Sequence, residues 1–351
     1  MIEVDGSLGE GGGQVLRTAV ALAAVLSKEI HLFNIRAGRA EPGLRPQHMT
    51  GVKAAAELCS ANLQGLDVGA TEFVFKPGKL QAGNFRFDVG TAGSVTLVLQ
   101  TLMPILAFAP GAVQLDITGG TDVKWSPPID YVRLVTLPIL KKFGYQGEVV
   151  LVRRGHYPKG GGLVRFSTPG PSELRPPMNN NSGSISRIYG ISHATALPRH
   201  VAERQAASAK KWLEGAKLPS PSIDIEVVDD RSQLSPGSGI VLSAENEHGT
   251  TLGSDALGER GRPAEEVGST AGRILTEEVE SGAMLDRHMG DMIIPYLVLA
   301  GGASEVSVSR VTQHTMTNVK VAEWLTGTRF NLEGQVDQPG TLQVTGINKG
   351  L

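Results

Sequence analysis

Residues 2–26, IEVDGSLGEGGGQVLRTAVALAAVL, contain a short strand, a glycine-rich turn and an apolar helix in succession. The alternation in IEVD predicts the strand, and the apolar run from Val15 predicts the helix. The same order returns in residues 85–108, FRFDVGTAGSVTLVLQTLMPILAF, at an offset of about 80 residues. The chain therefore contains a repeated unit.

Both copies continue with a strand, a loop containing proline, a helix and two closing strands. The second strand and second helix are expected at 31–38 and 48–59 in the first copy and at 113–120 and 128–144 in the second. A shorter third copy is expected near the end of the chain. Its elements are a helix at 291–302, a strand at 304–311, a helix at 317–325 and closing strands at 329–334 and 342–347.

This order predicts an α/β (α+β) fold of three βαβαββ units, each with helices on one face of a four-stranded mixed sheet. The units are expected to pack with their helices inward, in a repeat domain of residues 1–183 and 283–351. Residues 184–282 do not match the repeat and predict a smaller inserted α/β domain, with the order strand, helix, strand, strand, helix. A polar segment rich in Pro and Asn, residues 169–184, precedes this domain.

The composition limits the classes of function. The chain has 33 basic and 35 acidic residues among 351, so no broad basic field is expected and any contact with RNA must be local. Its single cysteine, Cys59, lies in an apolar helix, which excludes an internal disulfide and argues against structural zinc. There is neither a signal peptide nor a long apolar run, so a cytoplasmic protein without a membrane segment is expected.

The first candidate site is the turn Glu10-Gly11-Gly12-Gly13-Gln14 with Arg17 one helical turn later. A carboxylate, exposed backbone amides and a guanidinium on one face would form a cradle for phosphate or a metal phosphate. The alternative is an ordinary glycine-rich turn, in which Glu10 caps the helix and Arg17 is solvated.

The second candidate site is the loop IRAGRAEPGLRPQH, residues 35–48. It presents several cationic or polar side chains, namely Arg36, Arg39, Arg45, Gln47 and His48. Only Glu41 is nearby to neutralise them, and guanidinium groups bind phosphate through paired hydrogen bonds. An anion site is therefore favoured over a solvated surface.

Two further candidates lie in the third copy. His314, between a strand and a helix, can project into a ligand crevice, although a lone histidine is more often a helix-start or packing residue. Asp291 follows Arg287-His288-Met289-Gly290 and can bind a metal or cap the helix.

Taken together, the motifs of the chain resemble those of the RNA 3′-terminal phosphate cyclase family. In chain order they are EGGGQVLRTA, IRAGRAEPGLRPQH, GSVTLVLQT, TGGTD, YPKGGG, PRHVAER and HTMTN. The resemblance runs along nearly the whole chain, and the expected inserted domain falls where that family carries its own.

The resemblance implies an ATP-dependent enzyme that forms a covalent histidine adenylate and passes AMP to an RNA 3′-phosphate. The vicinal 2′-hydroxyl then attacks to give a 2′,3′-cyclic phosphate. By resemblance His314 is the adenylated residue, and the essential acidic, Gln and Arg positions are Glu10, Gln14, Arg17, Arg36, Arg39 and Gln47. Glu10 and Asp291 are the expected ligands for Mg²⁺ or Mn²⁺.

The same resemblance assigns ATP contacts to Gln100, Gln14, Gln47 and the pentad His288, Met289, Gly290, Asp291 and Met292. The family typically has Gln at the last pentad position, and Met292 cannot make the hydrogen bonds of an amide. Two other classes remain open, a non-catalytic ribosome-biogenesis branch of the family and the enolpyruvyl transferases. The oligomeric state and the physiological RNA are not predicted.

Overall fold

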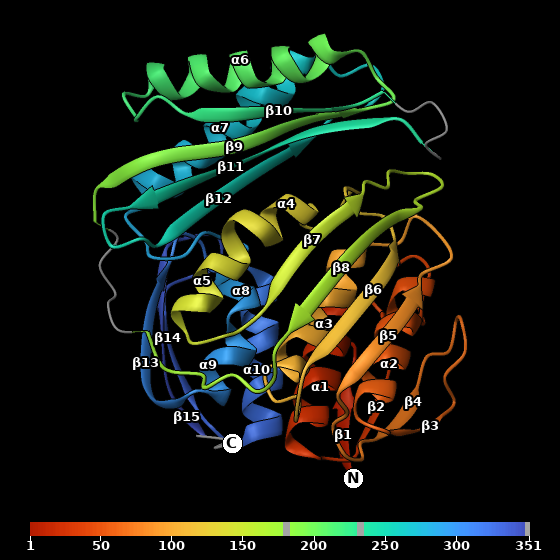
Figure 1. Cartoon of the computed structure of the whole chain (residues 1–351). Coiled ribbons are helices and arrows are strands. Elements are labelled where there is room, and N and C mark those ends of the chain that lie inside the picture. The colour runs from red at the N-terminus through yellow and green to blue at the C-terminus, as the bar shows by residue number, and fades with distance from the viewer. Residues whose placement is uncertain (178–182, 230–234, 348–351) are drawn as a thin grey trace.

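The computed structural model describes residues 1–177, 183–229 and 235–347, and Figure 1 shows its elements. Strands and helices alternate along the chain, and the strands form separate small sheets. The predicted α/β class is confirmed.

The first unit begins at the N-terminus and forms one mixed sheet with two helices. Its elements are β1 (Ile2–Asp5), α1 (Gly13–Leu26), β2 (Ile30–Phe33), α2 (Pro46–Leu58), β3 (Asn62–Gln64) and β4 (Phe73–Lys76). The strand order is β1-β2-β4-β3, with β1 parallel to β2 and β4 antiparallel to β2. Strand β2 ends at Phe33, earlier than predicted, because Asn34 and Arg36 adopt positive φ angles that extended strands do not allow.

The second unit has the matching strand order β5-β6-β8-β7. Its elements are β5 (Gly83–Asp88), α3 (Val95–Leu106), β6 (Val113–Gly119), α4 (Ile129–Tyr131), η1 (Val132–Thr136), α5 (Leu137–Lys142), β7 (Glu148–Arg153) and β8 (Gly162–Thr168). The segment predicted as one helix at 128–144 is helical but contains the π-helical turn η1. This turn precedes Pro138, which has no N–H group to donate to a regular α-helical ladder.

The third unit is incomplete. Its elements are α8 (Met289–Met292), α9 (Ile294–Leu299), β13 (Gly301–Val308), α10 (Gln313–Thr326), β14 (Phe330–Glu333) and β15 (Gly340–Ile347). The prediction of a βαβαββ unit is wrong here, because the sheet has the three strands β13-β15-β14. Where a first strand would lie, Leu285 makes a single bridge to Val308, and the Asp286 carboxylate then accepts the N–H groups of His288 and Met289 and starts the helix.

The helices of the three units form the centre of the large core. Helix α1 contacts α3 and α10, and α2 contacts α3, so each unit packs its helices on those of another. Figure 1 shows these helices behind the sheet of the second unit. Helix α1 is buried around most of its circumference, since Ala, Val and Leu side chains occupy ten of its 14 positions. Cys59 is buried where α2 ends, as expected.

A separate group of strands and helices, called the insert below, follows the second unit and precedes the third in the chain. It lies at the top of Figure 1. It comprises β9 (Ile185–Thr195), α6 (Arg199–Gly215), β10 (Ser222–Val228), β11 (Gly237–Asn246), β12 (Thr251–Leu257) and α7 (Ala264–Glu280). The insert has one strand more than predicted, because Asn246 accepts the N–H groups of His248 and Thr250 and closes a tight β11–β12 hairpin. It has a hydrophobic core of its own. The boundaries 184–282 stay a prediction.

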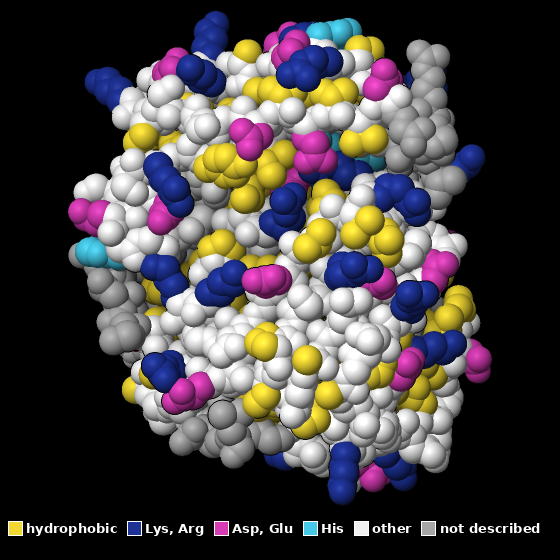
Figure 2. Space-filling view, in the orientation of Figure 1, with side chains coloured by type: hydrophobic (Ala, Val, Ile, Leu, Met, Phe, Trp, Pro, Cys, Tyr) yellow, Lys and Arg dark blue, Asp and Glu magenta, His cyan; other side chains and the backbone are white. Residues whose placement is uncertain are grey.

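The surface carries both signs of charge. On the face in Figure 2, described basic and acidic side chains are interspersed instead of separated into broad patches. Across the described ranges, no helix is both long and apolar enough to cross a membrane.

Candidate active site

The candidate residues gather where helices begin. Glu10 lies just before Gly12, the N-cap of α1, and Arg39 lies in the loop that leads to α2. His314 is the second residue of α10, which starts four residues earlier than predicted because the Thr312 hydroxyl accepts the N–H group of Thr315. The first turns of helices have free N–H groups and a positive dipole end, which favour bound anions.

Glycines allow the two N-terminal loops to touch. Gly11 has a φ of +55°, and a Cβ there would lie 2.7 Å from the backbone nitrogen of Gly38. A Cβ on Gly12 would lie 2.9 Å from a guanidinium nitrogen of Arg39. Side chains at these positions would separate the loops, so the glycines hold the α1 turn against the arginine loop.

Glu10 connects this turn to the third unit. One Glu10 carboxylate oxygen lies 3.2 Å from the Arg39 guanidinium and 3.8 Å from Nδ1 of His314. The alternative that Glu10 caps α1 is wrong, because the N-cap residue is Gly12 and no side chain caps it.

A buried network joins α1 to α10. The Asn318 side-chain oxygen accepts hydrogen bonds from the Gln14 amide at 3.1 Å and from the Thr18 hydroxyl at 2.6 Å. The Asn318 amide donates to the backbone carbonyl of Asp291 at 2.8 Å. Arg17 donates to Gln14, so the sequence-predicted Gln14, Arg17 and Asp291 belong to one network.

Arg17 and Asp291 influence each other electrostatically. Burial lowers the pKa of Arg17 to about 10, against the opposing attraction of Asp291, so the alternative of a solvated Arg17 is wrong. Burial raises the pKa of the Asp291 carboxyl to about 8, Arg17 opposes that rise, and the like charges of Asp286 and Glu10 add to it. Asp286 supplies the caps of helix α8, so Asp291 does not have the capping role.

His314 is held in its neutral form. Burial lowers the pKa of His314 below its usual value, Glu10 opposes this, and the cations Arg17 and Arg39 add to it. A neutral imidazole keeps a lone pair available as a nucleophile near pH 7.

The arginine loop contains side chains of two kinds. Arg36 donates to the carbonyl oxygens of Glu41 and Gly43 at 2.8 and 2.9 Å, and Arg45 pairs with Glu41, so both groups already have partners inside the loop. Arg39 instead points to Glu10 and is largely exposed. The predicted anion-binding capacity is therefore concentrated on Arg39.

Gln47 and His48 have structural partners at the start of α2. The Gln47 side-chain oxygen accepts the N–H group of Ser94 at 2.9 Å and so ties α2 to the start of α3. His48 Nδ1 accepts the N–H group of Arg45, and burial together with nearby arginines lowers the pKa of His48 to about 3. Both side chains hold the loop geometry in this structure.

The remaining predicted nucleotide contacts differ in environment. The Gln100 side-chain oxygen, on α3, is buried without a hydrogen-bond partner in the described chain. In the pentad, Met289, Gly290 and Met292 are buried, and the ring of His288 meets Tyr131 edge-on at 5.8 Å. These positions are compatible with the predicted ATP contacts. Among the described residues, the side chains of Gln100, His288 and Met292 make no hydrogen bond to Glu10, Arg39 or His314.

Sequence reasoning missed Asn318 and Thr18. Asn318 lies in the quoted motif HTMTN, but its role depends on partners in α1, about 300 positions away. The only signal for these residues in the sequence was a polar side chain at a helix position that was expected to be buried.

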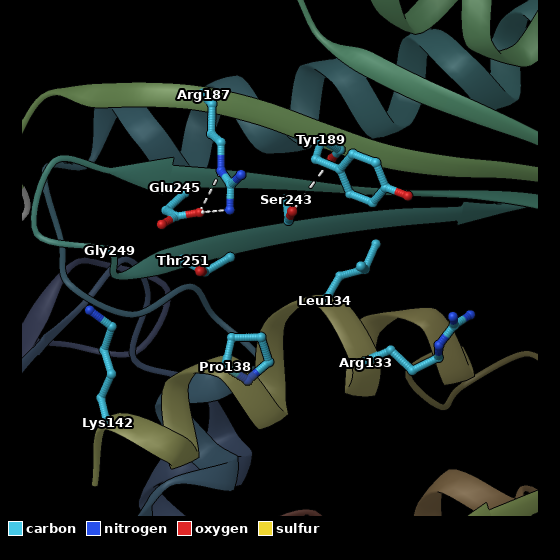
Figure 3. A pocket seen from close by; sticks show the side chains of 10 residues that line it. All are labelled: Arg133, Leu134, Pro138, Lys142, Arg187, Tyr189, Ser243, Glu245, Gly249 and Thr251. Carbon is cyan, nitrogen blue, oxygen red and sulfur yellow. Dashed lines mark hydrogen bonds and ion pairs between the residues drawn. The ribbon is translucent and has the colours of Figure 1, made fainter. Parts of the chain in front are cut away.

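A pocket of about 450 Å³ lies elsewhere, between the insert and helices η1 and α5 (Figure 3). Its lining includes Arg133, Lys142, Arg187 and Tyr189, and Arg187 pairs with Glu245. It contains none of the predicted site residues, and we do not assign the activity to it.

A histidine, a carboxylate and cations gathered at helix starts define a site suited to phosphate groups. Comparison with known proteins gives the family. The family model for RNA 3′-terminal phosphate cyclase matches residues 8–332. The chain belongs to the RNA 3′-terminal phosphate cyclase family.

Curated relatives agree with this family over nearly their whole length. The RNA 3′-terminal phosphate cyclase of Hyperthermus butylicus is 51% identical, with 99% of this chain and 98% of the relative covered. The protein of the same name from Ignicoccus hospitalis is 49% identical, with 99% of both chains covered. That from Pyrococcus abyssi is 48% identical, with 98% of both covered.

Proposed function

We propose that this protein converts an RNA 3′-terminal phosphate to a 2′,3′-cyclic phosphodiester with ATP as co-substrate, releasing AMP and pyrophosphate. The observation that carries the proposal is His314, a neutral and partly exposed histidine in the first turn of α10. It faces the carboxylate of Glu10 and lies close enough to Arg17 and Arg39 for their charges to affect it. Family membership supports this choice of reaction.

The first step forms the histidine adenylate. The Glu10 carboxylate lies on the Nδ1 side of His314 and favours a proton there, which leaves the Nε2 lone pair free. Nε2 attacks the α-phosphorus of ATP, an N–P bond forms, and the P–O bond to the leaving pyrophosphate breaks.

The next two steps transfer AMP and close the ring. An oxygen of the RNA 3′-phosphate attacks the phosphorus of the adenylate, and the N–P bond to His314 breaks. The vicinal 2′-hydroxyl then attacks the activated 3′-phosphorus, loses its proton, and displaces AMP. Attachment of AMP gives the 3′-phosphorus a good leaving group, and this is the purpose for which ATP is consumed.

The surrounding side chains would stabilise phosphate charge. Arg39 is the exposed guanidinium beside His314, and Arg17 lies deeper in the Gln14 network. Arg36 shapes the loop through its bonds to backbone carbonyls. The N-terminus of α1, with the Gly11–Gly13 amides, adds a positive dipole end on the same side.

The residues present fit a hard divalent cation. Glu10 and Asp291 offer carboxylate oxygens, which Mg²⁺ and Mn²⁺ prefer. Burial, and after it the charges of Asp286 and Glu10, raises the pKa of Asp291, and a bound cation would favour its ionised form. Held by these residues, such an ion would supply positive charge to phosphate oxygens.

Labelling with ATP carrying ³²P in the α-phosphate tests the proposal. The wild-type protein should retain label that is released by acid and stable to alkali, as expected for a phosphoramidate. The His314→Ala variant should retain none while unfolding at the wild-type temperature, because His314 supplies a bond and little packing. Label retained by this variant would contradict the assignment of His314 as the adenylated residue.

His200→Ala is the matched control, since His200 is also the second residue of a helix, α6, and is exposed. It should label like the wild type. Absence of label in wild type and control alike would instead support a non-catalytic, cyclase-like binding protein.

A further inference from the structure

Three side chains from separate segments meet beneath the insert. Asp122 follows β6, His156 follows β7, and His193 lies in β9 of the insert. One potential ligand atom from each residue lies within 4.8 Å of those from the other two. Within residues 1–177, 183–229 and 235–347, no other His, Cys, Asp and Glu side chains form such a group of three.

Three of the four ring nitrogens of the two histidines lack hydrogen-bond partners among the described residues. His156 and His193 are 4% and 1% exposed, and their rings stack with centroids 5.4 Å apart. Nε2 of His156 and both ring nitrogens of His193 are buried without a partner among the described residues. A buried polar group left unpaired costs about 1–3 kcal/mol, so retaining three such atoms in one place calls for a ligand.

Glycines make room for both rings. A Cβ on Gly237 would lie 2.2 Å from Cγ of His156, and a Cβ on Gly239 would lie 3.0 Å from Cε1 of His193. Both glycines belong to β11, the strand that pairs with β9. The insert therefore leaves a space shaped for these imidazoles.

The surrounding charges favour a cation. Arg154, whose side chain is 1% exposed, donates to Asp122 at 3.2 Å, to Asp130 at 2.6 Å and to Glu226 at 2.9 Å. Asp130 also pairs with Arg133 at 2.6 Å. Three carboxylates thus face two guanidinium groups, which leaves one negative charge over. Asp122 and Asp130 are fully buried, whereas Glu226 is 37% exposed.

We propose that Asp122, His156 and His193 bind a transition-metal ion, Zn²⁺ above all, which fastens the insert to the second unit. Two imidazole nitrogens and one carboxylate oxygen are ligands that zinc accepts at about 2.0–2.2 Å, and three protein ligands leave a fourth position for water. Mg²⁺ would be disfavoured, because it prefers oxygen ligands. The sequence-based argument against structural zinc rested on cysteine, and this site needs none.

The protonation state of the histidines suits this role. Burial lowers the pKa of both His156 and His193, so both rings are neutral near pH 7. Neutral imidazole is the form that coordinates metal. This proposed site lies apart from Glu10 and Asp291 and does not depend on the proposed reaction.

Metal titration of the untagged, chelator-stripped protein tests the proposal. Zn²⁺, added in competition with a chromophoric chelator, should bind with one tight equivalent per chain, and Co²⁺ should give the intense visible absorption of a low-coordinate site. His156→Gln and His193→Gln should each weaken Zn²⁺ binding by more than about 100-fold. Losing a residue that only hydrogen-bonds a metal ligand already weakens binding by up to about this factor, and losing the ligand itself should cost more. Each variant is checked for folding by circular dichroism.

His200→Gln, on the exposed face of α6, is the control for adventitious binding and should keep the tight equivalent. Absence of a tight equivalent in the wild type would overturn the proposal, as would unchanged binding in both folded variants. If neither variant folds, the wild-type Co²⁺ spectrum decides, and a spectrum of six-coordinate aqueous cobalt would overturn it.

Discussion

The residues around His314 and those around Arg154 form two polar clusters, and both join segments far apart in the chain. Around His314 the charged groups are partly open, since the side chains of Glu10, Arg39 and His314 are each about two-fifths exposed. Around Arg154 the corresponding side chains are buried, since Arg154 is 1% exposed and Asp122 and Asp130 are 0% exposed. Both clusters contain opposite charges at short range, but only around Arg154 are a guanidinium and two of its carboxylate partners fully buried.

This difference in exposure predicts that the first cluster contributes mainly to ligand binding and the second mainly to the stability of the fold. A charge that is partly hydrated can exchange water for an incoming phosphate, whereas a buried charge already depends on its neighbours. Changes near His314 should therefore alter activity more than folding. Changes near Arg154 should alter folding first.

The largest expected effect is that of Arg154→Ala. Removing this guanidinium leaves Asp122 and Asp130 buried without their principal partner, and breaking such a pair costs about 3–5 kcal/mol of stability. Urea unfolding in the presence of a chelator measures the loss. Arg165→Ala is the control, because Arg165 makes a similar two-bond pair with Asp116 at an exposed position and should change stability far less. Equal losses in the two variants would contradict the comparison.

A smaller effect, on activity, is expected for Arg39→Ala. Losing hydrogen bonds to a charged phosphate costs about 1.5–3 kcal/mol, so the rate of adenylate formation should fall by about 10- to 150-fold. The free energy of unfolding should change little, since Arg39 is exposed and Glu10 is its only hydrogen-bond partner among the described residues. Single-turnover labelling and urea unfolding measure the two quantities.

Arg36→Ala sharpens this second prediction. We expect a phosphate interaction of the same size for Arg36, whose guanidinium also donates to the carbonyls of Glu41 and Gly43. Its loss should reduce both activity and stability, whereas Arg39→Ala should reduce activity alone. Wild-type rates in both variants would mean that the loop is a solvated surface.

The smallest effect is expected for Met292→Gln. Met292 is 8% exposed in α8, so it offers dispersion contact where the family typically has an amide. One hydrogen bond to a neutral group is worth about 0.5–1.5 kcal/mol, so the variant should favour ATP over GTP by about tenfold more at most. The ratio of adenylylation rates with ATP and GTP is the measurement. A constant ratio would show that this side chain does not touch the nucleotide.

Much of the fold could be predicted from the sequence, because the strand, turn and helix signals of the first two units are local. The third unit departs from the pattern where a side chain intervenes, since the Asp286 carboxylate starts a helix in place of a strand. The extra strand of the insert was missed for a similar reason. Its hairpin is closed by the side chain of Asn246, which hydropathy patterns do not report.

The candidate site was predictable only in part. Glu10, Arg17 and His314 carry motif signals, and the structure brings them together. Asn318 and the group of Asp122, His156 and His193 carry no local spacing signal, because their partners come from different units. Contacts between distant segments are set by packing, and packing has no signature in a short window of sequence.

The hydrogen bond between Gln14 and Asn318 has a consequence for the synthesis of the protein. It joins residues 304 positions apart, so a ribosome adding about 5–20 residues per second finishes the second partner about 15–60 s after the first. Until then the nascent chain has its glycine-rich turn and arginine loop but no α10 to complete them. Translation must therefore pass α10, which ends at Thr326, before the proposed adenylation of His314 can begin.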